Sequence, residues 1–137
     1  MSLAVTLTLP DKVKSGAPVP GSLAVTNTGH VPISIVIPDY AAAMNLVVFD
    51  HYWNQVTPNS VGKVHVAYTR TDLAPGAAKV FPLADLAFTT ATARMLFQLK
   101  PGTYHVAAIY HPGTAQLPDQ STYPHAAVSV PRTLIVE

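Results

Sequence analysis

The sequence predicts an all-β protein: residues 1–137 are expected to form one domain, a single antiparallel β-sandwich of seven to nine strands without a disulfide. Three observations predict this class. Apolar residues alternate with small polar ones at a period of two in segment after segment. Glu137 is the only glutamate, although surface helices rely on this residue type. The chain also has 13 prolines and no cysteine, a composition typical of short strands joined by turns.

The first three strands are predicted from alternation alone. Residues 3–9 form the first, which Pro10 ends, with one face made of Leu3, Val5, Leu7 and Leu9. The segment GSLAVTN, residues 21–27, forms the second, with Leu23 and Val25 pointing inward. The third covers residues 31–37, and one face of it should carry Val31, Ile33, Ile35 and Ile37.

Five further strands are expected in the remainder of the chain: residues 45–51, 63–69, 74–83, 104–110 and 126–136, the last with a bulge at Pro131. Turn residues every 8–12 positions between short strands indicate a sandwich or a barrel. Two segments do not fit this pattern. YAAAMN, residues 40–45, is expected to form a helical turn, and LADLAFTTATARML, residues 83–96, a short helix or an irregular crossover.

The segment LKPGTYHV, residues 99–106, resembles the tyrosine corner of immunoglobulin-like sandwiches. The resemblance implies that Leu99 is the core residue before the turn, that Gly102 makes the turn, and that the Tyr104 hydroxyl bonds to nearby backbone. Val106 stands where antibody domains have a cysteine, and isoleucines replace the strand C tryptophan. The chain therefore resembles disulfide-free members of the superfamily, both bacterial surface and periplasmic immunoglobulin-like modules and the bacterial intracellular proteinase-inhibitor family.

Composition excludes several classes of partner. Charged residues make up 11% of the chain and the formal net charge is +1, without a basic stripe between aromatics, so no nucleic acid is expected. No apolar run approaches the roughly 20 residues that span a membrane. The lack of cysteine fits both the cytoplasm and export, and we expect an exported protein, periplasmic or on the cell surface. Edge strands leave a monomer and a weak dimer open.

No catalytic pattern is present, and the protein is not expected to be an enzyme. The sequence has neither a Gly-x-Ser-x-Gly elbow nor a glycine-rich phosphate loop. Its six aspartates include no close pair suited to acid–base catalysis. No cofactor is expected.

The histidines allow a metal hypothesis. In an immunoglobulin-like topology His30, His111 and His125 would lie at one pole of the sandwich, with His51 and His65 near the same end. Asp119 and Tyr123 lie in the loop between His111 and His125. Imidazoles are common zinc and copper ligands, so three of them could form a divalent-metal site. The alternative is a set of separate surface histidines, since no compact motif such as His-x-x-x-His occurs.

The segment FDHYWNQ, residues 49–55, contains the only tryptophan of the chain. Tyr52, Trp53 and Asn54 either cover the open end of the sandwich or form an exposed anchor for a partner. The segment 111–125 is long for a hairpin, and long loops on a rigid scaffold often bind ligands.

The leading prediction from these segments is a non-catalytic binding or accessory module that recognises a protein or a glycan through loops at one pole. One alternative is a proteinase inhibitor that presents QLPDQSTYP, residues 116–124, in extended form. The second is a divalent-metal-binding protein that uses the histidines.

Overall fold

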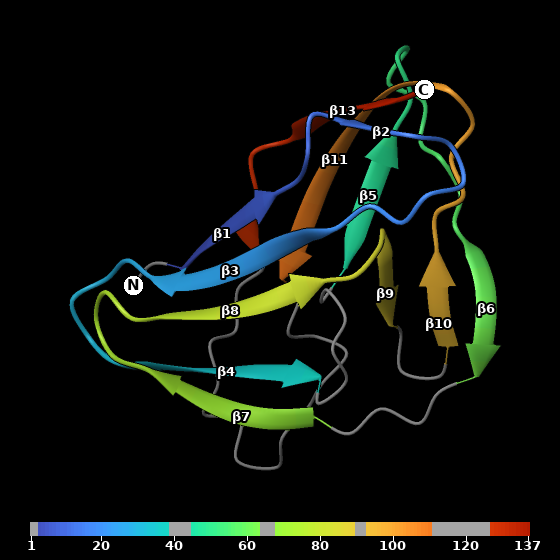
Figure 1. Cartoon of the computed structure of the whole chain (residues 1–137). Coiled ribbons are helices and arrows are strands. Elements are labelled where there is room, and N and C mark those ends of the chain that lie inside the picture. The colour runs from blue at the N-terminus through green and yellow to red at the C-terminus, as the bar shows by residue number, and fades with distance from the viewer. Residues whose placement is uncertain (1–2, 39–44, 64–67, 90–92, 111–126) are drawn as a thin grey trace.

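The computed structural model describes residues 3–38, 45–63, 68–89, 93–110 and 127–137 (Figure 1). These residues form strands and no helix, so they include no helix long and apolar enough to cross a membrane. The predicted all-β class is therefore confirmed. The strands are β1 (Leu3–Thr8), β2 (Lys12–Val13), β3 (Gly21–Asn27), β4 (Ile33–Pro38), β5 (Leu46–Phe49), β6 (Asn59–Lys63), β7 (Tyr68–Leu73), β8 (Ala78–Leu83), β9 (Ala87–Thr89), β10 (Ala93–Leu96), β11 (Gly102–Tyr110), β12 (Ala127–Val128) and β13 (Arg132–Val136).

One layer is the antiparallel sheet β1-β3-β8. Val5 pairs with Val25 and Leu7 with Leu23, so their side chains lie on the same face of the sheet. All four are buried, as the alternation predicts.

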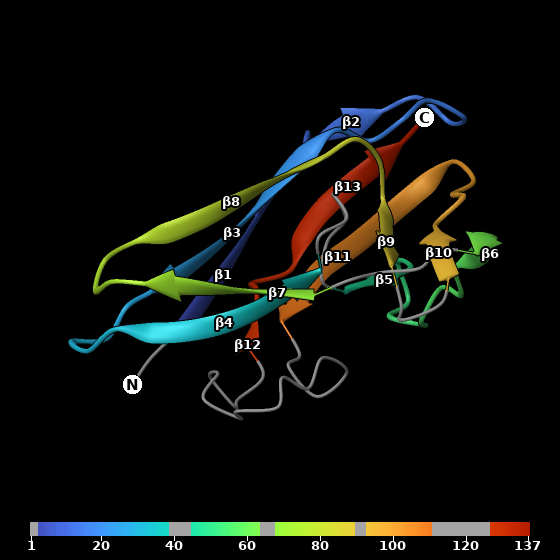
Figure 2. The same ribbon diagram turned by 90° about the horizontal axis from the view of Figure 1, so that it is seen from below.

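The second layer is built around β11, the longest strand. It pairs with β5 on one side and with β13 and then β12 on the other, and β13 pairs in parallel with β2. Figure 2 shows this layer beside β1, β3 and β8. The faces of β5, β11 and β13 that point at the first layer are buried and apolar, and carry Leu46, Val48, Val106, Ala108 and Leu134.

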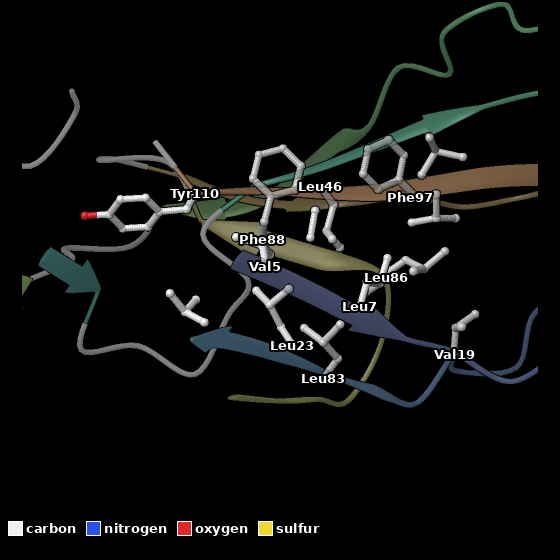
Figure 3. Close-up of a cluster of buried hydrophobic side chains, with 14 of the residues drawn as sticks. Val5, Leu7, Val19, Leu23, Leu46, Leu83, Leu86, Phe88, Phe97 and Tyr110 are labelled. Carbon is white, nitrogen blue, oxygen red and sulfur yellow. The ribbon is translucent and has the colours of Figure 1, made fainter. Parts of the chain in front are cut away.

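The two layers pack across a single hydrophobic core (Figure 3). Val5, Leu7 and Leu23 contribute from the first layer, and Leu46 and Tyr110 from the second. The aromatic rings of Phe88 and Phe97 lie in the same core, with centroids 5.9 Å apart. The Arg132 side chain links the layers at their edge, where its Nε donates to the Leu7 carbonyl at 3.0 Å. The arrangement is that of a β-sandwich without cysteine.

The hydrogen bond expected from the Tyr104 hydroxyl to nearby backbone is present. The Tyr104 hydroxyl donates to the Lys100 carbonyl at 2.7 Å, and its ring is buried in the core. This bond fixes the turn that precedes β11, because it joins the start of the strand to the backbone four residues earlier.

Several predicted elements differ from those observed. Residues 83–96 contain no helix among those described: β9 and β10 form an antiparallel hairpin, and β10 also pairs with β6. The strand expected over residues 63–69 is represented by its two ends, since Lys63 ends β6, Tyr68 begins β7, and residues 64–67 lie outside the described part of the chain. The described residues hold 13 strands, more than the seven to nine expected.

Three smaller expectations concern Val31, Pro131 and residues 40–45. Val31 lies outside β4 and is exposed, so it does not share a buried face with Ile33. Pro131, which has no N–H, lies between β12 and β13 and divides the last strand. Of the segment YAAAMN, residues 40–44 lie outside the described part of the chain.

Candidate binding site

An aromatic loop, residues 50–55, leaves β5 beside the start of β11. Phe49 pairs with His105 and Leu46 with Ala108. Because the two strands are antiparallel, the end of β5 lies next to the first half of β11. The loop forms the tip beside the C-terminus in Figure 1.

Asp50 closes this loop. Its Oδ1 accepts hydrogen bonds from the Tyr52 and Asn54 N–H groups, each at 2.9 Å. Its backbone accepts from the Trp53 N–H at 3.0 Å and donates to the Asn54 carbonyl at 2.9 Å. The chain then returns along β5, where the Val56 N–H donates to the Val48 carbonyl at 2.8 Å. Four hydrogen bonds from one residue therefore fix the loop.

Trp53 adopts a left-handed backbone conformation with φ at 64°, and among the described residues it is the one non-glycine residue with positive φ. Such a conformation costs about 1–3 kcal/mol and persists only where surrounding contacts impose it. Here the hydrogen bonds of Asp50 to both neighbouring N–H groups impose it. This backbone conformation directs the indole ring onto the side of the second layer that faces away from the first layer.

The indole stacks on the His105 imidazole with ring centroids 4.0 Å apart and an interplanar angle of 5°. Phe49 contacts it at a tilt, with centroids 5.8 Å apart. The Thr133 hydroxyl lies 3.5 Å from Nδ1 of His105. Thr133 belongs to β13, which pairs with β11 on the side opposite β5. Trp53 nevertheless remains 57% exposed. The stacking on His105 therefore covers only part of the residue.

The residues on either side of Trp53, Tyr52 and Asn54, have exposed polar side chains. Tyr52 is 80% exposed, and its ring makes an edge contact with His51 at 5.3 Å. Asn54 and Gln55 are also exposed. The one carboxylate of the loop belongs to Asp50 and already accepts two hydrogen bonds. The loop thus offers a flat aromatic surface bordered by amides and imidazoles.

The sheet face beneath the loop continues this uncharged surface. On it lie Val47, Phe49, His105, Ile109 and Val128, which the strand register places on one side. Val128 is 61% exposed, and Val130, beyond the buried Ser129, is also exposed. The Lys12–Glu137 ion pair, at 3.8 Å, lies where β13 ends. We call the surface formed by Val47, Phe49, His105, Ile109 and Val128 the outer face of the second layer.

The structure brings together only part of the predicted site. Tyr52, Trp53 and Asn54 lie together in the aromatic loop, whereas the exposed His30 lies in the turn between β3 and β4, at the other end of the molecule (Figure 1). His111, Asp119, Tyr123 and His125 lie outside the described residues, as do His65 and the segment 116–124. The described residues include no group of three or more His, Cys, Asp or Glu that could hold a metal ion.

The expectation that these loops share one pole is wrong for the aromatic loop. It lies beside the start of β11, whereas Tyr110, which precedes residue 111, ends that strand. The prediction placed His51, at the end of the strand expected over residues 45–51, near the same end as His30. In the structure β4 pairs with β7, and β5 pairs directly with β11.

Two residues of the site were not predicted. Asp50 follows a strand and precedes an aromatic pair, a position where aspartate commonly caps a turn, so its role had a local signal. His105 had none, because its stacking partner lies far from it in the sequence.

The described structure also has hollows away from the aromatic loop. One, about 530 Å³, lies between residues 13–19 and 96–101. Its carboxylate, Asp85, accepts hydrogen bonds from the Val19 and Leu86 N–H groups and so serves the fold. Another, about 520 Å³, lies between β1 and β13 beside Arg132, whose Nε bonds to the Leu7 carbonyl.

Comparison with known proteins yields no family. No protein-family model matches the chain, and no curated protein matches it. Among solved structures, a β-glucosidase from Listeria innocua in complex with isofagomine is similar over 98% of this chain and 16% of its own, with a TM-score of 0.45 and 13% identity. A β-glucosidase from Erythrobacter marinus is similar over 98% and 15%, with a TM-score of 0.42 and 16% identity. The chain therefore spans less than a fifth of either protein, and a likeness at these TM-scores carries no inference about activity.

Proposed function

We propose that this protein is a non-catalytic binding or accessory module of the immunoglobulin-like type, which contacts a protein or glycan partner through the aromatic loop. The observation that carries the proposal is the conformation of Trp53. The residue is held in a strained left-handed conformation, with one face of its large indole stacked on His105, and it remains 57% exposed.

Strain at an exposed aromatic residue points to binding rather than to packing. A residue needed only to cover the sheet would adopt an ordinary conformation and be buried, whereas Trp53 is 57% exposed. Tryptophan and tyrosine contribute much of the binding energy at interfaces. The four hydrogen bonds of Asp50 hold the loop before any partner arrives, which lowers the entropic cost of association.

The immunoglobulin-like assignment is supported by two features. Two antiparallel layers pack across one core, and the Tyr104 hydroxyl caps the turn before β11 as in a tyrosine corner. In sandwiches of this kind the sheets form a rigid scaffold, and loops at the ends bind. The aromatic loop occupies such an end.

The test is a binding screen with matched variants. Wild-type protein is displayed against a neutral glycan array and a random peptide library, and each ligand recovered is titrated against Trp53→Ala, Tyr52→Ala and Val80→Ala. Val80 is 59% exposed on β8, in the other layer, and is the control. We expect Trp53→Ala to weaken binding about tenfold or more, equal to roughly 1.4 kcal/mol, with Val80→Ala unchanged. Ligands that bind both aromatic variants as tightly as wild type would contradict the proposal.

A further inference from the structure

We infer that the ligand of the aromatic loop is a neutral pyranoside with equatorial substituents, of which one face stacks on the open face of Trp53. This inference rests on the proposed function and narrows it to one class of ligand. It is carried by three properties of the loop: an exposed indole with one face stacked on His105, polar neighbours that can hydrogen-bond, and no lysine or arginine between residues 46 and 62.

The shape of the site comes from the stacked pair. His105 lies parallel to the indole at 4.0 Å, so one ring face is stacked on the imidazole and a ligand would stack on the other. A pyranose ring with equatorial substituents directs its axial C–H bonds to its two flat faces. These C–H bonds match the negative face of an aromatic ring, which attracts the positive edges of neighbouring groups.

The neighbours of the indole suit hydroxyl groups. Each sugar hydroxyl both donates and accepts a hydrogen bond, and so does each side-chain amide. Asn54 follows Trp53 directly, and Gln55 and His51 are exposed in the same loop. The loop therefore contains donors and acceptors that could bond to the hydroxyl groups of a stacked pyranose.

The charge of the site argues against ionic ligands. No lysine or arginine occurs between residues 46 and 62, so phosphates, sulfates and uronates would find no cation to pair with in this segment. The Asp50 carboxylate is already engaged by two N–H groups. Cationic ligands are held by aromatic residues on several sides, whereas the Tyr52 ring contacts His51 and leaves Trp53 with a single open face.

A proline-rich peptide is the competing ligand, since such peptides also dock on aromatic residues. They bind in grooves lined by several rings. In this loop each exposed ring contacts a histidine, Tyr52 contacting His51 and Trp53 contacting His105, and the Tyr52 and Trp53 rings do not pair with each other. The exposed indole therefore offers a flat surface rather than a groove, and this favours a ligand with a flat ring face.

The test uses cellohexaose as the probe, with hexagalacturonate and an octaproline peptide as comparisons. Trp53 is the only tryptophan, so its fluorescence reports on the site. We expect cellohexaose alone to produce a saturable change, at concentrations up to about 10 mM. Calorimetry should show at least a tenfold loss of affinity in Trp53→Ala, and none in Val80→Ala. Saturation-transfer NMR should give its strongest signals for the axial protons H1, H3 and H5 of one glucose face.

The outcomes separate this inference from the proposal on which it rests. If cellohexaose does not bind, or binds equally to Trp53→Ala, the inference is overturned. If octaproline or a library peptide then binds in a Trp53-dependent way, the proposed binding function still stands. If no glycan or peptide depends on Trp53, both are wrong. Equal binding of hexagalacturonate would also overturn the inference, because it would show that the site accepts charge.

Discussion

Asn27 is a polar residue with no exposed surface, yet each of its polar groups has a partner. Its Nδ2 donates to the Val31 and Leu73 carbonyls at 2.8 and 3.0 Å, and its Oδ1 accepts from the Gly29 N–H at 3.0 Å. Its backbone bonds to Gly76 and Ala77. The side chain therefore joins the turn between β3 and β4 to the turn between β7 and β8. Nothing in its local sequence distinguished it from the neighbouring turn residues.

Replacement of this amide should be costly. Asn27→Ala removes three side-chain hydrogen bonds and leaves the buried Leu73 carbonyl and the partly buried Val31 carbonyl and Gly29 N–H without these partners, so we expect the free energy of unfolding to fall by about 2–4 kcal/mol. Urea denaturation measures the change. Thr28→Ala, at the exposed neighbouring position, should change stability by less than about 0.5 kcal/mol. A loss below about 1 kcal/mol for Asn27→Ala would show that water replaces the amide.

Trp53 differs from Asn27, because its backbone is strained and its side chain is exposed. Asparagine tolerates the left-handed conformation, so Trp53→Asn should relieve strain that roughly offsets the lost stacking on His105. We expect the free energy of unfolding to change by less than about 1 kcal/mol, while ligand binding is lost. Trp53→Val, whose branched side chain disfavours positive φ, should be at least about 1 kcal/mol less stable than Trp53→Asn. Equal stability of the two variants in thermal melts would refute the strain argument.

At the scale of elements, local alternation identified strands well wherever one face is buried. Residues 3–9, 21–27 and 104–110 were expected as strands and contain β1, β3 and most of β11. Residues 83–96 were not recognised, because alanine, leucine and threonine in this order fit a helix as well as a strand. Strand pairing selects the strand conformation here, because β10 pairs with β9 and with β6, which comes much earlier in the chain.

The contact between β1 and β3 gives a test at this scale. A Cβ at Gly21 would lie 2.3 Å from the Thr8 carbonyl oxygen and 2.9 Å from Leu9 Cδ2. Because the first is a backbone atom of a paired strand, Gly21→Ala should reduce the free energy of unfolding by at least about 2 kcal/mol. Gly62 in β6 is the matched control, since nothing lies within 4 Å of the position that a Cβ would take there. Gly62→Ala should be neutral or stabilise by roughly 0.5 kcal/mol, and similar losses in both variants would contradict the close approach.

The whole molecule depends on one core between two layers, and its chain has no cysteine to crosslink them. The aromatic loop belongs to the same cooperative unit, because Trp53 rests on His105 of β11, the central strand of the second layer. A single core of this size usually unfolds in one transition.

We therefore expect Trp53 fluorescence and far-ultraviolet circular dichroism to give the same urea midpoint. The fluorescence reports the loop, while the dichroism reports all strands. A fluorescence transition at a lower urea concentration would show that the loop opens by itself, and the rigidity assigned to it in binding would then be absent. Asp50→Ala should produce such a separation, because it removes the carboxylate that holds the Tyr52 and Asn54 N–H groups.

The sequence by itself determined the all-β class, the buried faces of the main strands and the choice of Tyr52, Trp53 and Asn54 as candidates for contact. These follow from local alternation and turn chemistry, which neighbouring residues encode, whereas the hydrogen bond of the Tyr104 hydroxyl was expected from a family resemblance. Only the tertiary structure decided that β5 pairs with β11, which places the aromatic loop away from Tyr110 and sets His105 beneath Trp53. The order of strands in a sheet depends on the summed packing of distant segments, and a period of two is the same whichever neighbour a strand has.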